Sequence, residues 1–174
     1  GRDAAERARE VNARRRAGEL ERFALDASEH IRHLAEYARR SATPKSQHEV
    51  VAVLMKLREA TDDLRRQGAG GSAGLARLGA LERQVAEDLI YFNQAKGAKR
   101  VLGNAVDDLS EALRHGPPDR AVRGELAAAL FHAAGFAVDD GKFDDAVGLL
   151  RRSSGLLFVE PVDPQAVKHL TLSY

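Results

Sequence analysis

The chain has 174 residues, the length of one domain or of one domain with an extension. Alanine and leucine dominate with 30 and 21 residues, whereas aromatic residues make up 5% and cysteine and tryptophan are absent. Strong helix formers in this proportion predict an all-α protein and exclude a β-sandwich or barrel. The lack of cysteine excludes disulfides and thiol chemistry, and a net charge of +1 argues against a nucleic-acid-binding domain.

Apolar residues at three- and four-residue steps predict seven helices joined by short connections. The first covers residues 3–40, and its apolar stripe thins before Gly18, so we expect the N-terminal part to be exposed. The second begins at Thr43-Pro44, a capping hydroxyl followed by proline, and runs to residue 67. We expect residues 1–67 to form a long N-terminal helical hairpin.

Residues 68–72, Gly-Ala-Gly-Gly-Ser, are predicted to form a glycine-rich linker, and Ser72 is expected to cap a third helix. Gly97 and Gly103 are expected to bracket a break before the fourth helix. The later predicted helices cover residues 101–115, 120–139 and 143–157, with a short C-terminal capping helix through Val167, Leu170 and Leu172. Antiparallel hairpins over residues 73–174 are the simplest arrangement of such short connections.

Two segments of the second half repeat an order of large and small apolar residues. The fuller one contains Leu130, Ala133, Ala134, Gly141, Phe143, Ala146, Leu150 and Ser153; the weaker one contains Ala105, Leu109, Ala112 and Pro117. This pattern resembles the tetratricopeptide repeat (TPR), in which two helices cross closely at small residues. The likeness covers residues 86–161. It departs from the family at Ala137, where tyrosine is usual, and in the 41-residue step from Ala105 to Ala146, against about 34 in the family.

The resemblance implies a right-handed TPR-like α-solenoid whose first helices line a groove for a peptide or helix. Carried over by position, the groove residues are Tyr91, Gln94, Phe131, His132, Gly135 and Asp139. Phe131 either packs against the N-terminal helices or anchors a partner, and packing is favoured. We therefore expect a soluble, cytoplasmic, non-catalytic adaptor or scaffold, or a regulatory domain of a larger protein, that binds another protein and needs no cofactor.

Residues that could carry chemistry are few. Asp26, His30 and His33 share a helix face, which leaves a metal-binding helical bundle as a minor alternative, but the paired Glu-x-x-His segments of di-metal bundles are absent. Three pairs of neighbouring aspartates occur: Asp107-Asp108, Asp139-Asp140 and Asp144-Asp145. Neighbours on a helix diverge by about 100° and do not converge on one atom. An enzyme is not expected.

The stretch from residue 2 to residue 16 contains six arginines and three acids, without an aromatic residue on which a base could stack. Contact with a nucleic acid or an anionic surface is therefore an alternative function, with Arg7, Arg14, Arg15 and Arg16 as the contacts. Homodimerisation through this helix is a further alternative, and no membrane partner is expected. Because the chain begins with Gly1 instead of Met, we expect a piece of a longer protein.

Overall fold

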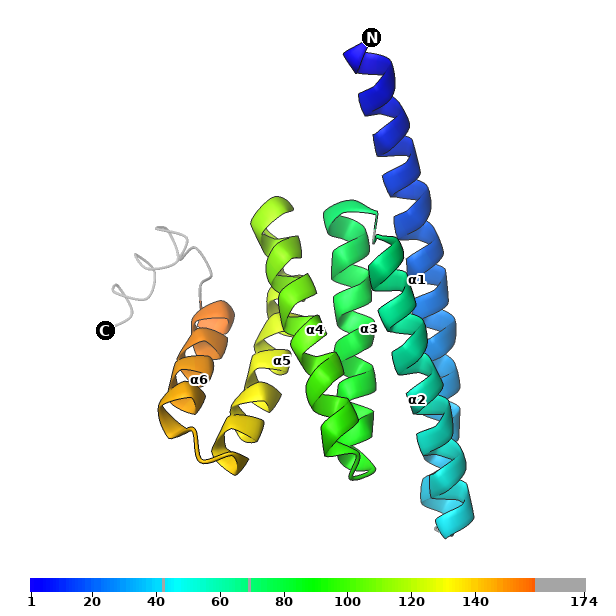
Figure 1. Ribbon diagram of the computed structural model, residues 1–174, viewed down its shortest axis with the longest axis vertical. Helices are drawn as coiled ribbons and strands as arrows, with labels where there is room; N and C mark the ends of the chain where they lie inside the picture. The colour runs from blue at the N-terminus through cyan, green and yellow to red at the C-terminus, as the bar shows by residue number, and fades with distance from the viewer. Residues whose placement is uncertain (42, 69, 159–174) are drawn as a thin grey trace, which may run out of the picture.

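The computed structural model describes residues 1–41, 43–68 and 70–158, apart from the side chain of Arg39, and its described elements are all α-helices (Figure 1). They are α1 (Arg2–Ser41), α2 (Pro44–Gln67), α3 (Gly71–Tyr91), α4 (Ala95–His115), α5 (Arg120–Asp139) and α6 (Phe143–Phe158). The all-α prediction is confirmed. The predicted capping helix lies outside the described residues.

Sequential helices pack antiparallel, and α3 lies at the centre of the arrangement. It contacts α1, α2 and α4 directly and touches α5, while α6 packs along α5 on the far side from α1 (Figure 1). The long hairpin of α1 and α2 therefore packs against α3 and does not cover α5. This order decides which faces of the last two helices remain exposed.

Two helix starts follow from local capping chemistry. The Thr43 hydroxyl accepts a hydrogen bond from the Ser46 backbone N–H at 3.2 Å, and proline occupies the first position of α2. The Asp119 carboxylate accepts from the N–H groups of Ala121 and Val122 at 2.8 and 3.4 Å, which caps α5. Both predicted helix starts are confirmed. They were predictable because each capping signal is contained in a few neighbouring residues.

The predicted linker is too long and the predicted cap is wrong, because α3 begins at Gly71. Gly70 precedes the helix with a φ of 75°, and Ser72 lies inside the first turn. A Cβ atom on Gly70 would lie 2.7 Å from the Ala13 carbonyl oxygen of α1. The glycine is required because this connection passes directly over α1.

The predicted start of α4 is also wrong, since the helix begins at Ala95 and includes Gly97 and Gly103. The preceding turn occurs instead at Asn93, whose φ is 59°. Gly97 is buried, and a Cβ atom there would lie 3.4 Å from the Met55 Cε atom of α2. Packing of this first turn against α2 outweighs the low helix propensity of glycine.

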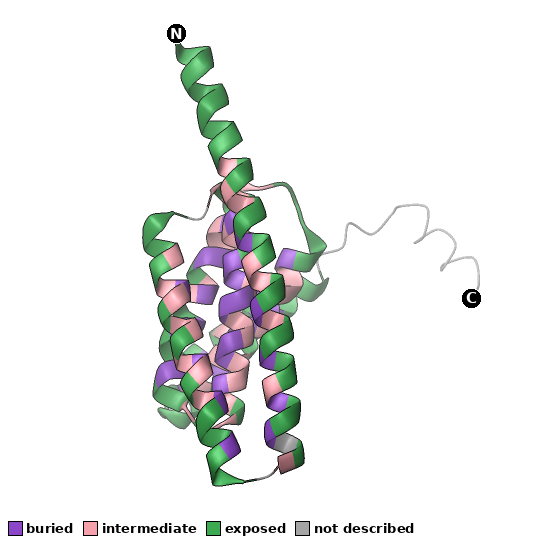
Figure 2. Ribbon diagram, turned by 90° about the vertical axis from the view of Figure 1, so that its right-hand side faces the viewer, coloured by how far each residue is buried: buried purple, intermediate pink, exposed green. Residues whose placement is uncertain are grey.

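Buried residues follow the inner faces of α2, α3, α4 and α5, whereas the first turns of α1 are exposed and extend beyond the other helices (Figure 2). The largest cluster includes Ile31, Leu54, Val85, Leu89, Leu102, Leu109, Leu126 and Leu130. Gly79 lets α3 approach α4, since a Cβ atom there would lie 2.5 Å from the Leu109 Cγ atom. A smaller cluster of Ala134, Ala137 and Ala146 joins α5 to α6.

Among the described residues, α5 alone meets the length and hydropathy of a membrane-spanning helix, with a mean hydropathy of 1.2. This is weak support for a span, because core helices of soluble proteins pass the same test. In the present structure 28% of that segment is buried, and α5 packs against α4 and α6. The expected absence of a membrane partner stays a prediction.

Candidate protein-interaction surface

An apolar hollow of about 310 Å³ lies between α5, α6 and the end of α3. Its lining includes Ile90 from α3, Phe131, His132, Gly135, Val138 and Asp139 from α5, and Leu150 from α6. We call it the Phe131 hollow. The lining is mostly hydrocarbon, with His132 and Asp139 as its ionisable side chains, so the hollow can bind apolar groups.

The position of Phe131 follows from the helical period of α5. Leu126, Leu130 and Ala134 are buried against the core, and Phe131 lies about 100° around the helix from Leu130. It is 61% exposed, so the prediction that it packs against the N-terminal helices is wrong. The physical reason is the order of the helices, because α1 and α2 pack on α3.

A chain of charged groups joins α3 to α5 beside the hollow. The His132 Nε2 atom lies 3.0 Å from the Glu87 Oε1 atom. Arg83 pairs with Glu87 at 2.7 Å and with Glu125 of α5. Partial burial would lower the pKa of Arg83, but hydrogen bonds and attraction to Glu125 and Glu87 raise it above its usual value. The pairs fix His132 at the edge of the hollow and fasten α5 to α3.

The structure brings together four of the six predicted groove residues: Phe131, His132, Gly135 and Asp139. Tyr91 is exposed and packs edge-on against Phe92, with ring centroids 5.0 Å apart, and it does not line the hollow. Gln94 lines a different hollow, beside Met55 and Arg58 of α2. The reason is that α3 ends at Tyr91, so Gln94 lies beyond the turn at Asn93.

Sequence reasoning missed Ile90, Val138 and Leu150. Val138 follows Phe131 by seven residues, and this two-turn spacing on one helix face was a usable signal. Leu150 carried no such signal, because its exposure depends on which side of α6 contacts α5. The buried residues Ala146 and Ser153 lie on the side of α6 that contacts α5.

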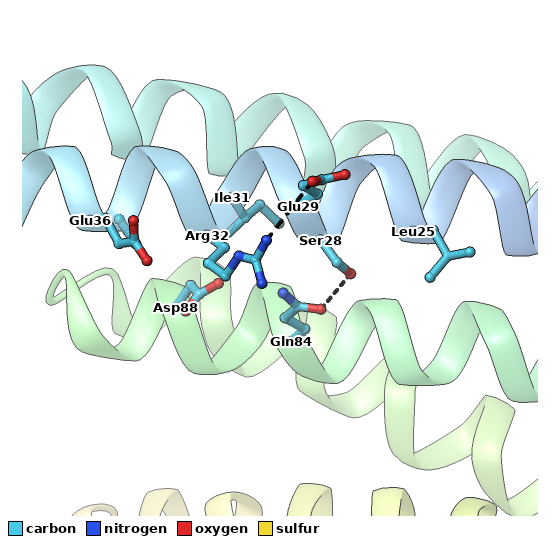
Figure 3. Close-up of a pocket in the computed structure, with 9 residues that line it drawn as sticks. Leu25, Ser28, Glu29, Ile31, Arg32, Glu36, Gln84 and Asp88 are labelled. Carbon is cyan, nitrogen blue, oxygen red and sulfur yellow. Dashed lines mark hydrogen bonds and ion pairs between the residues drawn. The ribbon is translucent and has the colours of Figure 1, made fainter.

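A second, more polar groove of about 810 Å³ runs between α1 and α3 (Figure 3). The Ser28 hydroxyl donates to the Gln84 Oε1 atom at 2.7 Å across it, and Arg32 lies 3.9 Å from Glu29. Acidic residues outnumber basic ones in the lining, which also contains Glu36 and Asp88. This groove was not predictable from the sequence, because both of its walls have polar residues that are typical of an ordinary solvated helix face.

A buried polar cluster joins α2, α3 and α4. The Arg65 Nε atom donates to Asp108 Oδ1 at 3.1 Å, and Asn104 bridges Arg65 and Asp62 at 2.8 and 3.0 Å. Glu82 of α3 is fully buried at the inner end of this cluster. If both carboxyl groups were ionised, the two Glu82 oxygens and Asp108 Oδ2 would have no hydrogen-bond donor among the described residues.

Burial raises the pKa of Glu82 to about 11. A hydrogen bond to Asp108 and the negative charge of that residue act in the same direction, while Arg65 lowers the pKa. Glu82 is therefore a neutral acid at pH 7, and its carboxyl O–H group donates a hydrogen bond to the neighbouring Asp108 carboxylate. The cluster is enclosed by three helices, so it acts on packing and offers no open reaction site.

The other predicted residues lie on α1. Asp26, His30 and His33 are exposed, and no group of three or more acids and histidines suited to a metal ion occurs in the part of the chain that the structure describes. Arg7 and Arg14 are exposed, and Arg15 lies 4.0 Å from Glu19. Arg16 instead donates to the Gly68 carbonyl and to Gln67 Oε1 at 3.2 and 2.6 Å, which holds the end of α2 against α1.

No protein-family model, no curated protein and no solved structure matches this chain. The resemblance to TPRs therefore depends on the residues quoted above and stays a prediction. The fold and the surface define an all-α protein of antiparallel helices with an exposed apolar hollow at one end.

Proposed function

We propose that this chain is a non-catalytic protein-interaction module whose Phe131 hollow binds a helix or an extended peptide of another protein. The observation that carries the proposal is the exposure of Phe131, Val138 and Leu150 around a hollow formed by three helices. Full burial of one such side chain by a partner contributes about 1.5–3 kcal/mol. Three together provide the apolar centre that binding interfaces use, with His132 and Asp139 at its rim.

The arrangement of helices supports a finer proposal about architecture. The pairs α1–α2, α3–α4 and α5–α6 are the units of a short right-handed TPR-like solenoid, in which α1, α3 and α5 are neighbours. Contacts of α3 with both α1 and α5 support this order. The close approach at Ala134, Ala137 and Ala146 supports it as well, because small residues at the helix crossing are a feature of that family. A cytoplasmic adaptor, scaffold or regulatory domain is the role that fits this architecture.

The test is selection of peptides from a phage-displayed random library on the immobilised chain, followed by affinity measurements with variants. Phe131→Asp should weaken the selected peptides by at least about tenfold, or about 1.4 kcal/mol. Val11→Asp is the matched control, because Val11 is an equally exposed apolar residue on α1. Circular dichroism checks that both variants fold. Equal affinity of the peptides for both variants, or no enrichment at all, would refute the proposal.

The N-terminal arm supports a second candidate function. We define the arm as residues 2–12 of α1, all of which are exposed. The first turns of α1 extend beyond the other helices (Figure 2), and an anionic surface can reach the exposed Arg2, Arg7 and Arg9 there. Asp3, Glu6 and Glu10 alternate with these arginines and bring the net side-chain charge of the arm to zero, so the hollow remains the preferred site.

A further inference from the structure

A second apolar stripe runs along α6, beside the Phe131 hollow and facing away from the core. It consists of Phe143, Val147, Leu150, Ser154 and Leu157, at alternating steps of four and three residues. Phe143 is 64% exposed and Val147 is 45% exposed. This spacing places the five side chains on one helix face, which we call the α6 stripe.

A neighbouring face of α6 is already used. Ala146 and Ser153 are buried against α5, and the Ser153 hydroxyl donates to the Ala127 carbonyl at 2.8 Å. Leu149 and Leu156 pack on the main core from the same side. Helix α6 is thus apolar on two faces, and the described residues cover one of them. A surface helix needs one apolar face, so the second requires an explanation.

The charges beside the α6 stripe indicate what covers it. Asp144 and Arg151 are seven residues apart and border the stripe on the same flank. About 10 Å separates them along the helix axis, which is too far for an ion pair within the helix. Neither has an ion-pair partner among the described residues, whereas Arg152, on the side of α6 opposite the stripe, donates to Ser110 of α4 at 2.9 Å.

We propose that the α6 stripe pairs with the same stripe of a second copy of this chain, in an antiparallel two-fold arrangement. Val147 then packs opposite Leu150 of the partner subunit, and Phe143 packs opposite Ser154 of the partner subunit, so that large and small side chains alternate. Residues on one flank of an antiparallel pair face each other. Asp144 therefore meets Arg151 of the partner subunit, and symmetry makes this ion pair twice.

The same charges argue against the other orientation and for a second copy as the occupant. In a parallel two-fold pair the same flank of the two helices lies on opposite sides of the seam, so Asp144 and Arg151 would not reach each other across it. The flank is self-complementary only when one helix is reversed. Such self-complementary charges are expected on a surface that binds a second copy of the same chain, whereas binding of an unrelated protein does not require them.

This inference goes beyond the proposed function and does not depend on it. Phe143 and Val147 do not line the Phe131 hollow, and Phe131 lies on α5. Leu150 belongs to both surfaces, so self-association and partner binding compete for it, and it is left out of the tests for that reason. A variant at Val147 therefore probes self-association, and a variant at Phe131 probes binding of a foreign partner.

Sedimentation equilibrium of the full chain over a concentration series measures the pairing directly. We expect a concentration-dependent species of twice the 18.9 kDa monomer mass. Val147→Asp should weaken the dimer by at least about tenfold, because a charge would be buried in the stripe. Val11→Asp is the matched control and should leave the dimer unchanged.

Charge reversal tests the orientation. Asp144→Arg and Arg151→Asp should each weaken the dimer, since each places like charges together, and the double variant should restore it. These residues are exposed, so the series stays informative even if Val147→Asp disturbs folding.

Four results would overturn the proposal: a monomer at all concentrations, a dimer unaffected by Val147→Asp, no recovery in the double variant, or loss of the dimer when residues 1–17 are removed. The last result would assign pairing to α1. A full-length monomer that dimerises when it is shortened to residues 1–158 would identify residues 159–174 as the cover of the stripe, which also contradicts the proposal.

Discussion

Replacing Glu82 with glutamine should increase the stability of the protein at neutral and alkaline pH. The buried Glu82 keeps its proton, with a pKa of about 11, while the same group in the unfolded chain loses it above about 4.5. Since the folded pKa is raised, the stability from this group is fully present below the unfolded pKa and falls as pH rises toward 11. Glutamine is neutral at every pH and can still donate to Asp108.

The magnitude follows from linkage. Each pH unit between the two pKa values costs up to about 1.4 kcal/mol, so the wild-type chain should lose up to about 4 kcal/mol from this group between about pH 5 and pH 8. Glu82→Gln should remove that slope. Relaxation around Glu82 and attraction to Arg65 reduce this free-energy cost. We therefore expect the free energy of unfolding of Glu82→Gln to exceed that of the wild type by on the order of 2–4 kcal/mol at pH 8.

Urea unfolding followed by circular dichroism at several pH values measures the effect. Glu59→Gln on the exposed face of α2 is the matched control, and its pH dependence should parallel that of the wild type. Histidine titration contributes equally to all three chains and cancels in the differences. If Glu82→Gln and the wild type lose stability with the same slope, the reasoning about a neutral buried acid is wrong.

Three further predictions concern the glycines and the arm. Gly79→Ala should destabilise the protein by about 1–3 kcal/mol in urea unfolding, because its Cβ atom would lie 2.5 Å from Leu109 Cγ; an unchanged midpoint would show that α3 and α4 can separate freely. Gly103→Ala should stabilise α4 by about 0.5–1 kcal/mol, since its Cβ atom meets nothing within 4 Å, and a loss of stability would contradict this. If the arm is the anionic contact, binding to duplex DNA or anionic vesicles should fall steeply with salt and disappear when residues 1–12 are removed; salt-insensitive binding would exclude it.

The helix boundaries show which features could be predicted from sequence. The start of α2 is fixed by adjacent residues, Thr43 and Pro44, and was predictable from them. The start of α4 was not, because glycine is a poor helix former, whereas Gly97 is buried inside the helix next to Met55 of α2. That contact depends on how separate helices pack, which local propensity does not contain.

Glu82 carried a signal that the sequence analysis did not use. It occupies the inward stripe Leu78, Glu82, Val85 and Leu89, at steps of four, three and four residues. Asp108 occupies the corresponding stripe of α4, between Ala105 and Ala112. An acid at an inward position on each of two helices predicts a buried pair only if those faces meet, and the contact between α3 and α4 could not be derived from either stripe alone.

The candidate site was predictable in part for a similar reason. The helical period of α5 places Phe131, Gly135 and Val138 on one face, so their common location follows from sequence. Whether that face is buried or open depends on the position of α1 and α2, which pack on α3. The prediction that Phe131 packs against the N-terminal helices was consequently the part that failed.

The close packing of Gly70 on α1 has a consequence for the stability of the arm. Gly70 approaches α1 at Ala13, directly after the arm, and residues 2–12 are exposed, so the other described helices do not bury the arm. An isolated helix of this length would be largely unwound in water, since starting a helix is costly. Here the packed part of α1 supplies the first turns, and only elongation remains, with an equilibrium constant near one for each residue. Each residue of the arm therefore adds little free energy to the helix, so a ligand that binds the helical form of the arm would favour the longer helix.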